Sequence, residues 1–314
     1  MSDTSTDQAA ASAQPPVEGA EGPPPEKGLK KKLFHEFRET AITIAIFVPF
    51  WLLFSTFFYE LRSIPSESMV PALQVGDRVA VAKFSYGYNR NSIPFGLGLM
   101  MIGDDPKNPE ERIMGSMPHR GDVIVFQHPH SDRVMIKRLM GLPGDTIQVK
   151  SGKLFLNGNE VPREKVRTTT YITGDENPRV QSATEYRQTI PTGEGDKTKE
   201  FLIHEFSDSD SLDETPIFKV PPGHVFMMGD NRDNSEDSRA PSGHRSMAAQ
   251  FPEAWPNRSV NLGAPPSEDA IGFVPMDYLI GRAETVLFTL KDFPFGCKAA
   301  PGTECPEGRL WKGL

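Results

Sequence analysis

The sequence predicts a mainly β protein, in which one antiparallel β domain follows a single N-terminal transmembrane helix. Apolar residues make up only 37% of the chain, which also holds 29 Pro and 27 Gly. This composition is typical of many turns and long loops rather than of a helical bundle. One uncharged apolar run near the N-terminus is long enough to cross a bilayer. Beyond it, short segments rich in Val, Ile and Phe alternate with turn residues, which is the pattern of strands.

The N-terminal residues 1–27 are predicted to form a disordered cytoplasmic tail. Residues 1–26 contain no Lys or Arg, several acidic residues, runs of proline and few large apolar side chains. A segment of this composition cannot bury enough apolar surface to offset the entropy lost on ordering.

Residues 28–60 are expected to comprise a basic flank and a membrane anchor. The uncharged run 41–58 would extend roughly 27 Å as a helix, at about 1.5 Å per residue. Basic residues cluster before this run, at Lys27, Lys30, Lys31, Lys32 and Arg38. Only Arg62 follows it closely, so the positive-inside rule places the N-terminus in the cytoplasm. A cleaved signal peptide is the alternative, but aromatic residues at 57–59 stand where a small-x-small cleavage site would be needed.

Residues 61–296 are expected to form one periplasmic β domain, with 297–314 as a C-terminal tail. Strands are predicted at 77–84, 122–127, 133–140, 153–156, 159–161, 224–228 and 284–290. Asn157-Gly158 is a type I′ hairpin signal between two of them. Two polar stretches, at about 162–216 and 240–270, interrupt this pattern and are expected to be surface insertions.

Charge and cysteine content exclude some classes of function. The formal net charge of the 314-residue chain is -8, and no concentrated basic face appears after residue 40, so we expect no nucleic-acid partner. Cys297 and Cys305 are too few for a zinc site. In an oxidising compartment they would close a small disulfide loop, and two unpaired surface thiols are the alternative.

Two serines lie in a proline-bracketed loop a few residues beyond the predicted anchor. The segment reads Ile64-Pro65-Ser66-Glu67-Ser68-Met69-Val70-Pro71-Ala72-Leu73. A rigid, sharply placed loop suits a nucleophile, but any Ser-rich turn has the same composition. From these residues alone, both interpretations stay open.

Lys137 lies in the predicted strand 133–140. Period-2 alternation places it on one face with Met135 and Leu139, so it would have apolar neighbours. Burial disfavours the ammonium form and can make a lysine a usable base near neutral pH. A solvent-reaching or salt-bridged lysine at a strand edge is the alternative.

A polar run, Gly229 to Arg239, follows the predicted strand 224–228. It lacks the Gly and Glu spacing of a calcium loop, so an ordered hydrogen-bonded loop is the better interpretation. Asp237 and Arg239 could pair and make this loop rigid, while Ser235 could orient a neighbouring amine.

Together, these segments resemble the successive boxes of the bacterial type I signal peptidases, which use a Ser/Lys dyad. The matching segments are 66–71, 121–126, 137–138 with 141–145, and 229–239, in that order and behind an anchor. The resemblance covers the anchor and roughly residues 60–160 and 217–290. It implies a signal-peptidase-like antiparallel β catalytic domain that needs no metal or organic cofactor.

The resemblance also implies a role for each site residue. Ser68 would be the nucleophile and Lys137 the general base. The Ser66 hydroxyl would join the Ser68 backbone N–H in the oxyanion hole, and Ser235 would orient the lysine. Asp237 and Arg239 would be a structural pair. The substrate pockets would be lined by Ile64, Pro65, Leu73, Met135 and Ile136, for which an ordinary core role is the alternative.

The expected function is that of a membrane-bound serine endopeptidase. It would remove signal peptides from exported preproteins after small-x-small sites, acting as a monomer in contact with membrane lipid. The expected location is the bacterial inner membrane, as a single-pass protein with a cytoplasmic N-terminus.

The chain departs from the family pattern at Glu67, where the best-known members carry a small residue, and in the long stretch 240–271. Two other functions remain as alternatives. A self-cleaving Ser/Lys protease resembling the SOS-response repressors is disfavoured by the anchor. A non-enzymatic binding module is disfavoured because Ser68, Lys137 and Ser235 are all present.

Overall fold

The structure is a computed structural model that describes residues 26–88, 115–173, 179–208, 212–240, 271–289 and 310–314. The chain forms two compact units, Met1–Trp51 and Leu52–Leu314. Residues 1–25 of the predicted tail, 1–27, lie outside the described residues, and its last two residues, Glu26 and Lys27, begin helix α1. Cys297, Cys305 and, apart from Ala240, the predicted insertion at 240–270 also lie outside the described residues.

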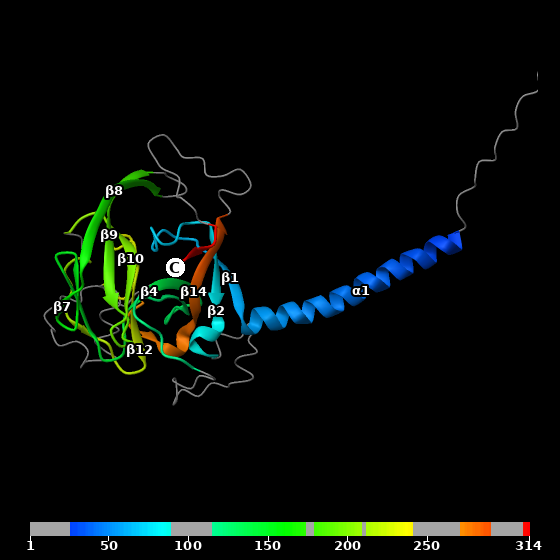
Figure 1. The fold of residues 1–314 in the computed structure, drawn as a ribbon, viewed down its shortest axis with the longest axis horizontal. Helices are drawn as coiled ribbons and strands as arrows, with labels where there is room; N and C mark the ends of the chain where they lie inside the picture. Colours follow the sequence, from blue (N-terminus) through cyan, green and yellow to red (C-terminus); the bar gives the residue numbers. More distant parts are fainter. Residues whose placement is uncertain (1–25, 89–114, 174–178, 209–211, 241–270, 290–309) are drawn as a thin grey trace, which may run out of the picture. The chain divides into compact units, whose positions relative to one another are not determined.

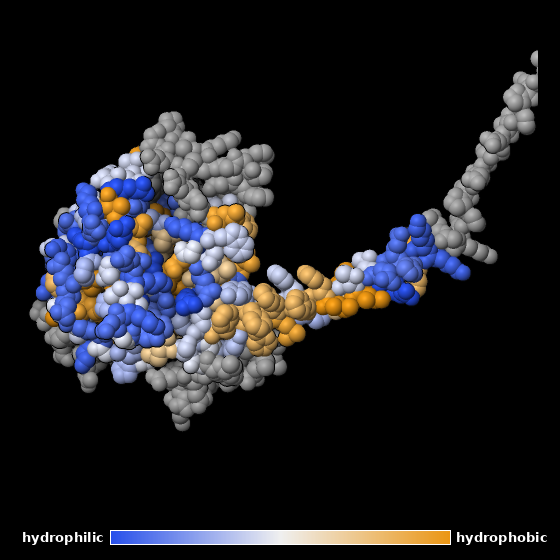
Figure 2. All heavy atoms as spheres, in the orientation of Figure 1, coloured by the Kyte–Doolittle hydropathy of each residue, from blue (hydrophilic) through white to orange (hydrophobic). Residues whose placement is uncertain are grey.

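The predicted anchor is helical. Helix α1 spans Glu26–Phe57, with Pro49 inside it. Within it, Lys31–Ser55 is long and apolar enough to cross a membrane, and protein does not bury its most apolar part. Figure 2 shows hydrophilic residues near the N-terminal end of α1 and hydrophobic ones along the rest of it. An apolar helix that is not covered by protein fits a membrane anchor.

The rest of the described chain is mainly antiparallel β, which confirms the predicted fold class. The largest sheet has the order β1-β2-β14-β3-β4-β12-β13, and β15 pairs with β14. Its strands are β1 Tyr59–Ser63, β2 Asp77–Ala82, β3 Val123–Gln127, β4 Val134–Gly141, β12 His224–Met228, β13 Val274–Pro275, β14 Leu279–Thr289 and β15 Lys312–Gly313. Figure 1 shows β14 running alongside β2. A short 3₁₀ helix, η1 Lys83–Tyr86, follows β2, and another, η4 Met276–Tyr278, lies between β13 and β14.

A second sheet contains the predicted hairpin. Its order is β11-β5-β6-β7, and its strands are β5 Thr146–Lys150, β6 Lys153–Leu156, β7 Asn159–Glu160 and β11 Phe218–Lys219. Asn157 and Gly158 join β6 to β7 with φ angles of 52° and 81°. Positive φ at both central residues is what a type I′ turn requires, so this prediction is confirmed.

The predicted insertion at 162–216 forms a third sheet rather than a purely surface excursion. Its order is β10-β9-β8, with β8 Arg163–Thr173, β9 Arg179–Pro191 and β10 Thr198–Glu205. Ile190, Phe201 and Ile203 belong to one hydrophobic core cluster with residues of β5 and β6. The expectation of a surface insertion is therefore corrected, because Ile190 of β9 and Phe201 and Ile203 of β10 are buried despite the polar composition of the stretch.

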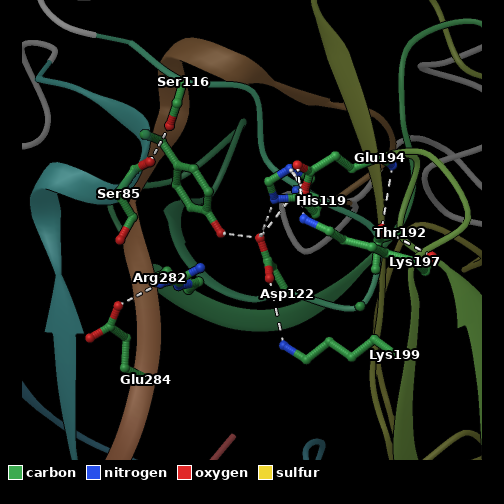
Figure 3. A network of polar contacts seen from close by, with 12 residues as sticks. Ser85, Ser116, His119, Asp122, Thr192, Glu194, Lys197, Lys199, Arg282 and Glu284 are labelled. Atoms are coloured by element: carbon green, nitrogen blue, oxygen red, sulfur yellow. Dashed lines mark hydrogen bonds and ion pairs between the residues drawn. The ribbon is translucent and has the colours of Figure 1, made fainter.

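Polar contacts join this third sheet to the start of β3. Lys199 of β10 lies 3.6 Å from Asp122, which also accepts a hydrogen bond from Tyr86 Oη at 3.0 Å. His119 lies 3.4 Å from Glu194, in the turn between β9 and β10 (Figure 3). Gly121 has φ +89°, and a Cβ there would come within 3.0 Å of the Lys199 side chain. The lysine stem therefore passes over a backbone position that suits glycine.

The C-terminal residues also belong to the fold. The sequence predicted a tail at 297–314, yet Thr285 and Val286 of β14 pair with Gly313 and Lys312. Leu314 packs against a core cluster that contains Val79 and Val286. The last residues therefore form part of the main sheet, which corrects the predicted tail at its end.

Candidate active site

The serine-bearing loop joins β1 to β2, and its ends are tied together. Ile64 N donates to Asp77 O at 3.0 Å, and Gly76 N donates to Ile64 O at 2.9 Å. Met69 and Leu73 are both fully buried and anchor the middle of the loop in the core. Hydrogen bonds at the base and buried side chains in the middle hold Ser68 in one place, which favours the nucleophile interpretation over a simple surface turn.

Ser68 and Lys137 are brought together from positions far apart in the chain. Lys137 Nζ lies 2.6 Å from Ser68 Oγ, as the donor of a buried hydrogen bond. Lys137 lies in β4, opposite Ile124 of β3, and is only 3% exposed. It is therefore not a solvent-reaching lysine at a strand edge. Both faces of β4 are buried from Ile136 onward, so the neighbours of Lys137 are not confined to the alternating positions.

Burial changes the acid–base properties of this lysine. Removal from water is the main cause, and it lowers the pKa of Lys137 to about 8. The nearby carboxylates of Asp237, Asp230 and Glu236 act in the opposite direction, while Arg239 lowers the pKa further. A lysine with this pKa has a usable neutral fraction near pH 7, which an exposed lysine lacks.

Ser66 lies next to Ser68. Its Oγ is 3.3 Å from Ser68 Oγ, and either hydroxyl can be the donor. Ser66 is exposed, in contrast to the 7% exposed Ser68. A second hydroxyl at this position can donate to an oxygen that develops negative charge beside Ser68.

The polar run Gly229–Arg239 is an ordered loop that is mostly buried, although Asn234 and Glu236 are exposed. Asp237 Oδ2 accepts hydrogen bonds from Gly229 N at 2.9 Å and from Arg239 Nη2 at 2.8 Å. Arg239 Nη2 also donates to Arg232 O at 2.6 Å. Burial alone would raise the pKa of the Asp237 carboxyl, but Arg239 and the backbone donors hold that pKa below its ordinary value. The charged pair thus closes the loop on itself.

Ser235 lies close to Ser68, and no hydrogen bond joins it to Lys137 among the described residues. Its side chain is 5% exposed, and its Oγ has no hydrogen-bond partner among the residues that the structure describes. A Cβ added to Gly229 would lie 2.2 Å from Ser235 Oγ and 2.5 Å from the Ser68 carbonyl oxygen. Ser235, Gly229 and Ser68 are therefore close together, and the predicted orientation of Lys137 by Ser235 stays a prediction.

An open groove of about 670 Å³ runs past the two catalytic candidates. It is lined by Pro65, Ser66, Glu67, Ser68, Val75, Arg133, Val134, Met135, Ile136, Lys137, Asn234 and Glu236. Three of the predicted pocket residues, Pro65, Met135 and Ile136, are among them. Ile64 and Leu73 do not line this groove. They are 2% and 0% exposed and lie in the core cluster that also contains Ile136.

Sequence reasoning assigned no role to Arg138 and Asp230, which brace the site. Arg138 Nε and Nη2 each donate to Asp230 at 2.7 Å, and Nη1 donates to Gly121 O at 2.6 Å. The guanidinium also lies 4.1 Å from the centre of the Phe201 ring, on β10. The Arg138–Asp230 pair is almost fully buried. Its contacts link β4, the Gly229–Arg239 loop and the third sheet. Both residues fell within the motifs, but local sequence does not show that they pair.

Comparisons with known proteins show the family of the chain. Residues 37–288 match the model of the family described as "Signal peptidase, peptidase S26". A signal peptidase I of Pseudomonas fluorescens is 33% identical over 263 residues, covering 83% of this chain and 75% of its own. A signal peptidase I of Rickettsia typhi is 30% identical, covering 74% of this chain and 73% of its own.

A solved structure of a signal peptidase I from Enterococcus faecalis is 21% identical and covers 53% of this chain and 97% of its own, with a TM-score of 0.25. The family match extends over most of the chain and includes both Ser68 and Lys137. The chain therefore belongs to the signal peptidase family, peptidase S26, and is a serine peptidase, a hydrolase.

Proposed function

We propose that this protein removes N-terminal signal peptides from exported preproteins, cutting after small-x-small sites with Ser68 as nucleophile and Lys137 as general base. The observation that carries the proposal is the 2.6 Å separation of Lys137 Nζ and Ser68 Oγ in a buried site beside a groove. The lowered pKa of Lys137, about 8, supports the role of a base.

Acylation begins with the neutral amine of Lys137. Its lone pair accepts the Ser68 hydroxyl proton while Ser68 Oγ attacks the carbonyl carbon of the scissile bond. The carbonyl oxygen becomes an oxyanion, to which the Ser66 hydroxyl and the Ser68 backbone N–H donate. The Lys137 ammonium then gives its proton to the leaving nitrogen, the C–N bond breaks, and the signal peptide remains as an ester on Ser68.

Deacylation repeats these steps with water as the nucleophile. Lys137 takes a proton from the water, and the resulting hydroxide adds to the ester carbonyl. The bond from carbon to Ser68 Oγ breaks, Lys137 returns the proton to Oγ, and the signal peptide leaves with a new carboxyl group, which loses its proton to solvent. Proton transfer in both halves of the reaction uses one base, so the reaction requires the neutral form of Lys137 at the start of each half.

The groove suits an extended peptide. The first residues of β4, from Val134, pair with β3 on one side, whereas pairing with β12 on the other side begins only at Arg138. Among the described residues, no strand pairs with Val134–Ile136 on that second edge. A substrate strand added there would lie along the groove that Pro65, Met135 and Ile136 help to line.

The same proposal extends to location and partners. The protein would act as a monomer in contact with lipid, anchored by α1 in the bacterial inner membrane as a single-pass protein. The basic residues before the apolar run support a cytoplasmic N-terminus and a catalytic domain on the periplasmic side.

Cleavage of a preprotein tests the function and the dyad together. The full chain, purified in detergent, is incubated with a preprotein that carries Ala at the first and third positions before the cut. We expect cleavage at that junction, lost in Ser68→Ala and in Lys137→Met. Lys153→Met is the matched control, because Lys153 is 47% exposed and forms an ion pair with Glu160 in the hairpin. Undiminished cleavage by Lys137→Met would refute the dyad, and no cleavage by the unmodified chain would refute the proposed function.

A further inference from the structure

Asn231 makes two hydrogen bonds to the nucleophile loop. Its backbone N donates to Ser68 O at 3.1 Å, and its side-chain Nδ2 donates to Glu67 O at 3.2 Å. Asn231 is fully buried. We infer that Asn231 is a positioning residue that fixes the peptide between Glu67 and Ser68, whose N–H serves as the oxyanion-hole donor. This inference rests on the proposed function.

The geometry of the peptide unit explains how Asn231 would act. The carbonyl of Glu67 and the N–H of Ser68 belong to one planar unit, which is trans, since the described cis bond is Val70-Pro71. In a trans peptide the C=O and N–H point in opposite directions, so fixing the oxygen fixes the direction of the N–H. Glu67 O also accepts a backbone bond from Val70 N at 3.1 Å, so Asn231 supplies a second donor to that oxygen. A donor on the carbonyl also polarises the amide and strengthens its N–H as a donor.

Asn231 is itself held in place from its other side by the third sheet. His204 N donates to Asp230 O, and Arg232 N donates to His204 O, both at 2.9 Å. Backbone bonds to β10 thus flank Asn231, which pairs with His204 in a parallel bridge. The segment 230–232 therefore lies between β10 and the nucleophile loop. The third sheet, which the sequence predicted to be a surface insertion, is therefore connected through Asn231 to the peptide between Glu67 and Ser68.

Removal of the Asn231 side chain should weaken binding of the tetrahedral state more than binding of substrate. The variants are Asn231→Ala and Asn231→Leu, the second of which keeps approximately the size of the side chain without its donor. The matched control is Asn159→Ala, an exposed amide in the β6–β7 hairpin. All are made in the full chain in detergent, and thermal unfolding establishes that each is folded.

Two probes separate the two kinds of binding. The first is a peptide boronic acid ending in Ala: Ser68 Oγ adds its lone pair to boron, its proton passes to Lys137, and a boronate oxygen occupies the oxyanion position. The second is an uncleavable peptide with Pro directly after the cleavage site, which forms no tetrahedral adduct.

We expect boronate affinity and kcat to fall about tenfold in both Asn231 variants, less than the 10²–10³ typical of deleting an oxyanion donor, because Val70 N still holds Glu67 O. Affinity for the uncleavable peptide should stay within about twofold, since ground-state binding does not use that donor. The pH at half-maximal activity should also stay near that of the unmodified chain. Equal losses for both probes, or no loss for either, would overturn the inference. Boronate binding that survives Ser68→Ala would instead refute the proposed function.

Discussion

The protonation state of Lys137 predicts how activity depends on pH. With a pKa of about 8, the neutral fraction is about 1% at pH 6, about one tenth at pH 7 and about half at pH 8. If the neutral amine is the base, kcat/KM on a preprotein should rise about fiftyfold between pH 6 and pH 8 and level off above pH 9. Activity is lost as pH falls because the ammonium has no lone pair to accept the Ser68 proton.

A charge variant tests whether the titration of Lys137 causes this rise in kcat/KM with pH. Glu236 is exposed, lines the groove and raises the pKa of Lys137. Glu236→Gln should therefore lower that pKa further and move the rise in activity to lower pH. Glu160→Gln, in an exposed hairpin ion pair, is the matched control and should leave the midpoint in place.

The assay is initial-rate cleavage of a fixed preprotein in detergent across pH 5.5 to 10, at constant ionic strength, because salt screens exposed charges. A rate that is flat between pH 6 and pH 9 would refute a lysine base with this pKa. So would a rate that is still rising without levelling off at pH 10, as the ordinary lysine pKa of 10.5 would require. An unshifted midpoint in Glu236→Gln would show that the titrating group is not Lys137.

Two further predictions concern stability and close packing. Folding lowers the pKa of Lys137 from 10.5 to about 8. Below pH 8 the buried ammonium therefore lowers the free energy of unfolding by about 3 kcal/mol. At pH 6.5, Lys137→Met should be more stable than the unmodified chain by up to that amount. Because the unfolded chain binds more protons between pH 8 and 10.5, this advantage should fade as pH rises through that window. Chemical unfolding at pH 6.5 and pH 10 measures it, and a less stable Lys137→Met at pH 6.5 would contradict the reasoning. Gly229→Ala should lower kcat/KM on the order of 100-fold, since its Cβ would come within 2.5 Å of Ser68 O and displace the nucleophile. Gly313→Ala, where a Cβ meets nothing within 4 Å, is the control, and full activity in Gly229→Ala would exclude the close packing described.

Local patterns predicted the elements of the fold well. Each predicted strand overlaps a strand of the structure, because alternation, β-branched residues and turn signals such as Asn157-Gly158 act within a few residues. The third sheet was not predicted, because β8 and β9 are mostly polar and their partners determine which positions are buried. β15 was not predicted either, since a two-residue strand has no periodicity and exists only through β14.

The sequence alone indicated the family, the membrane-length apolar run and the candidate residues for the chemistry, because these depend on residue type and order along the chain. Tertiary structure decided the rest. The 2.6 Å contact between Ser68 and Lys137, the buried Arg138–Asp230 pair and the hold of Asn231 on Glu67 all join residues far apart in sequence. The pKa of Lys137 likewise depends on burial beneath several elements at once. Desolvation and hydrogen-bond direction are properties of a three-dimensional environment, which no local pattern specifies.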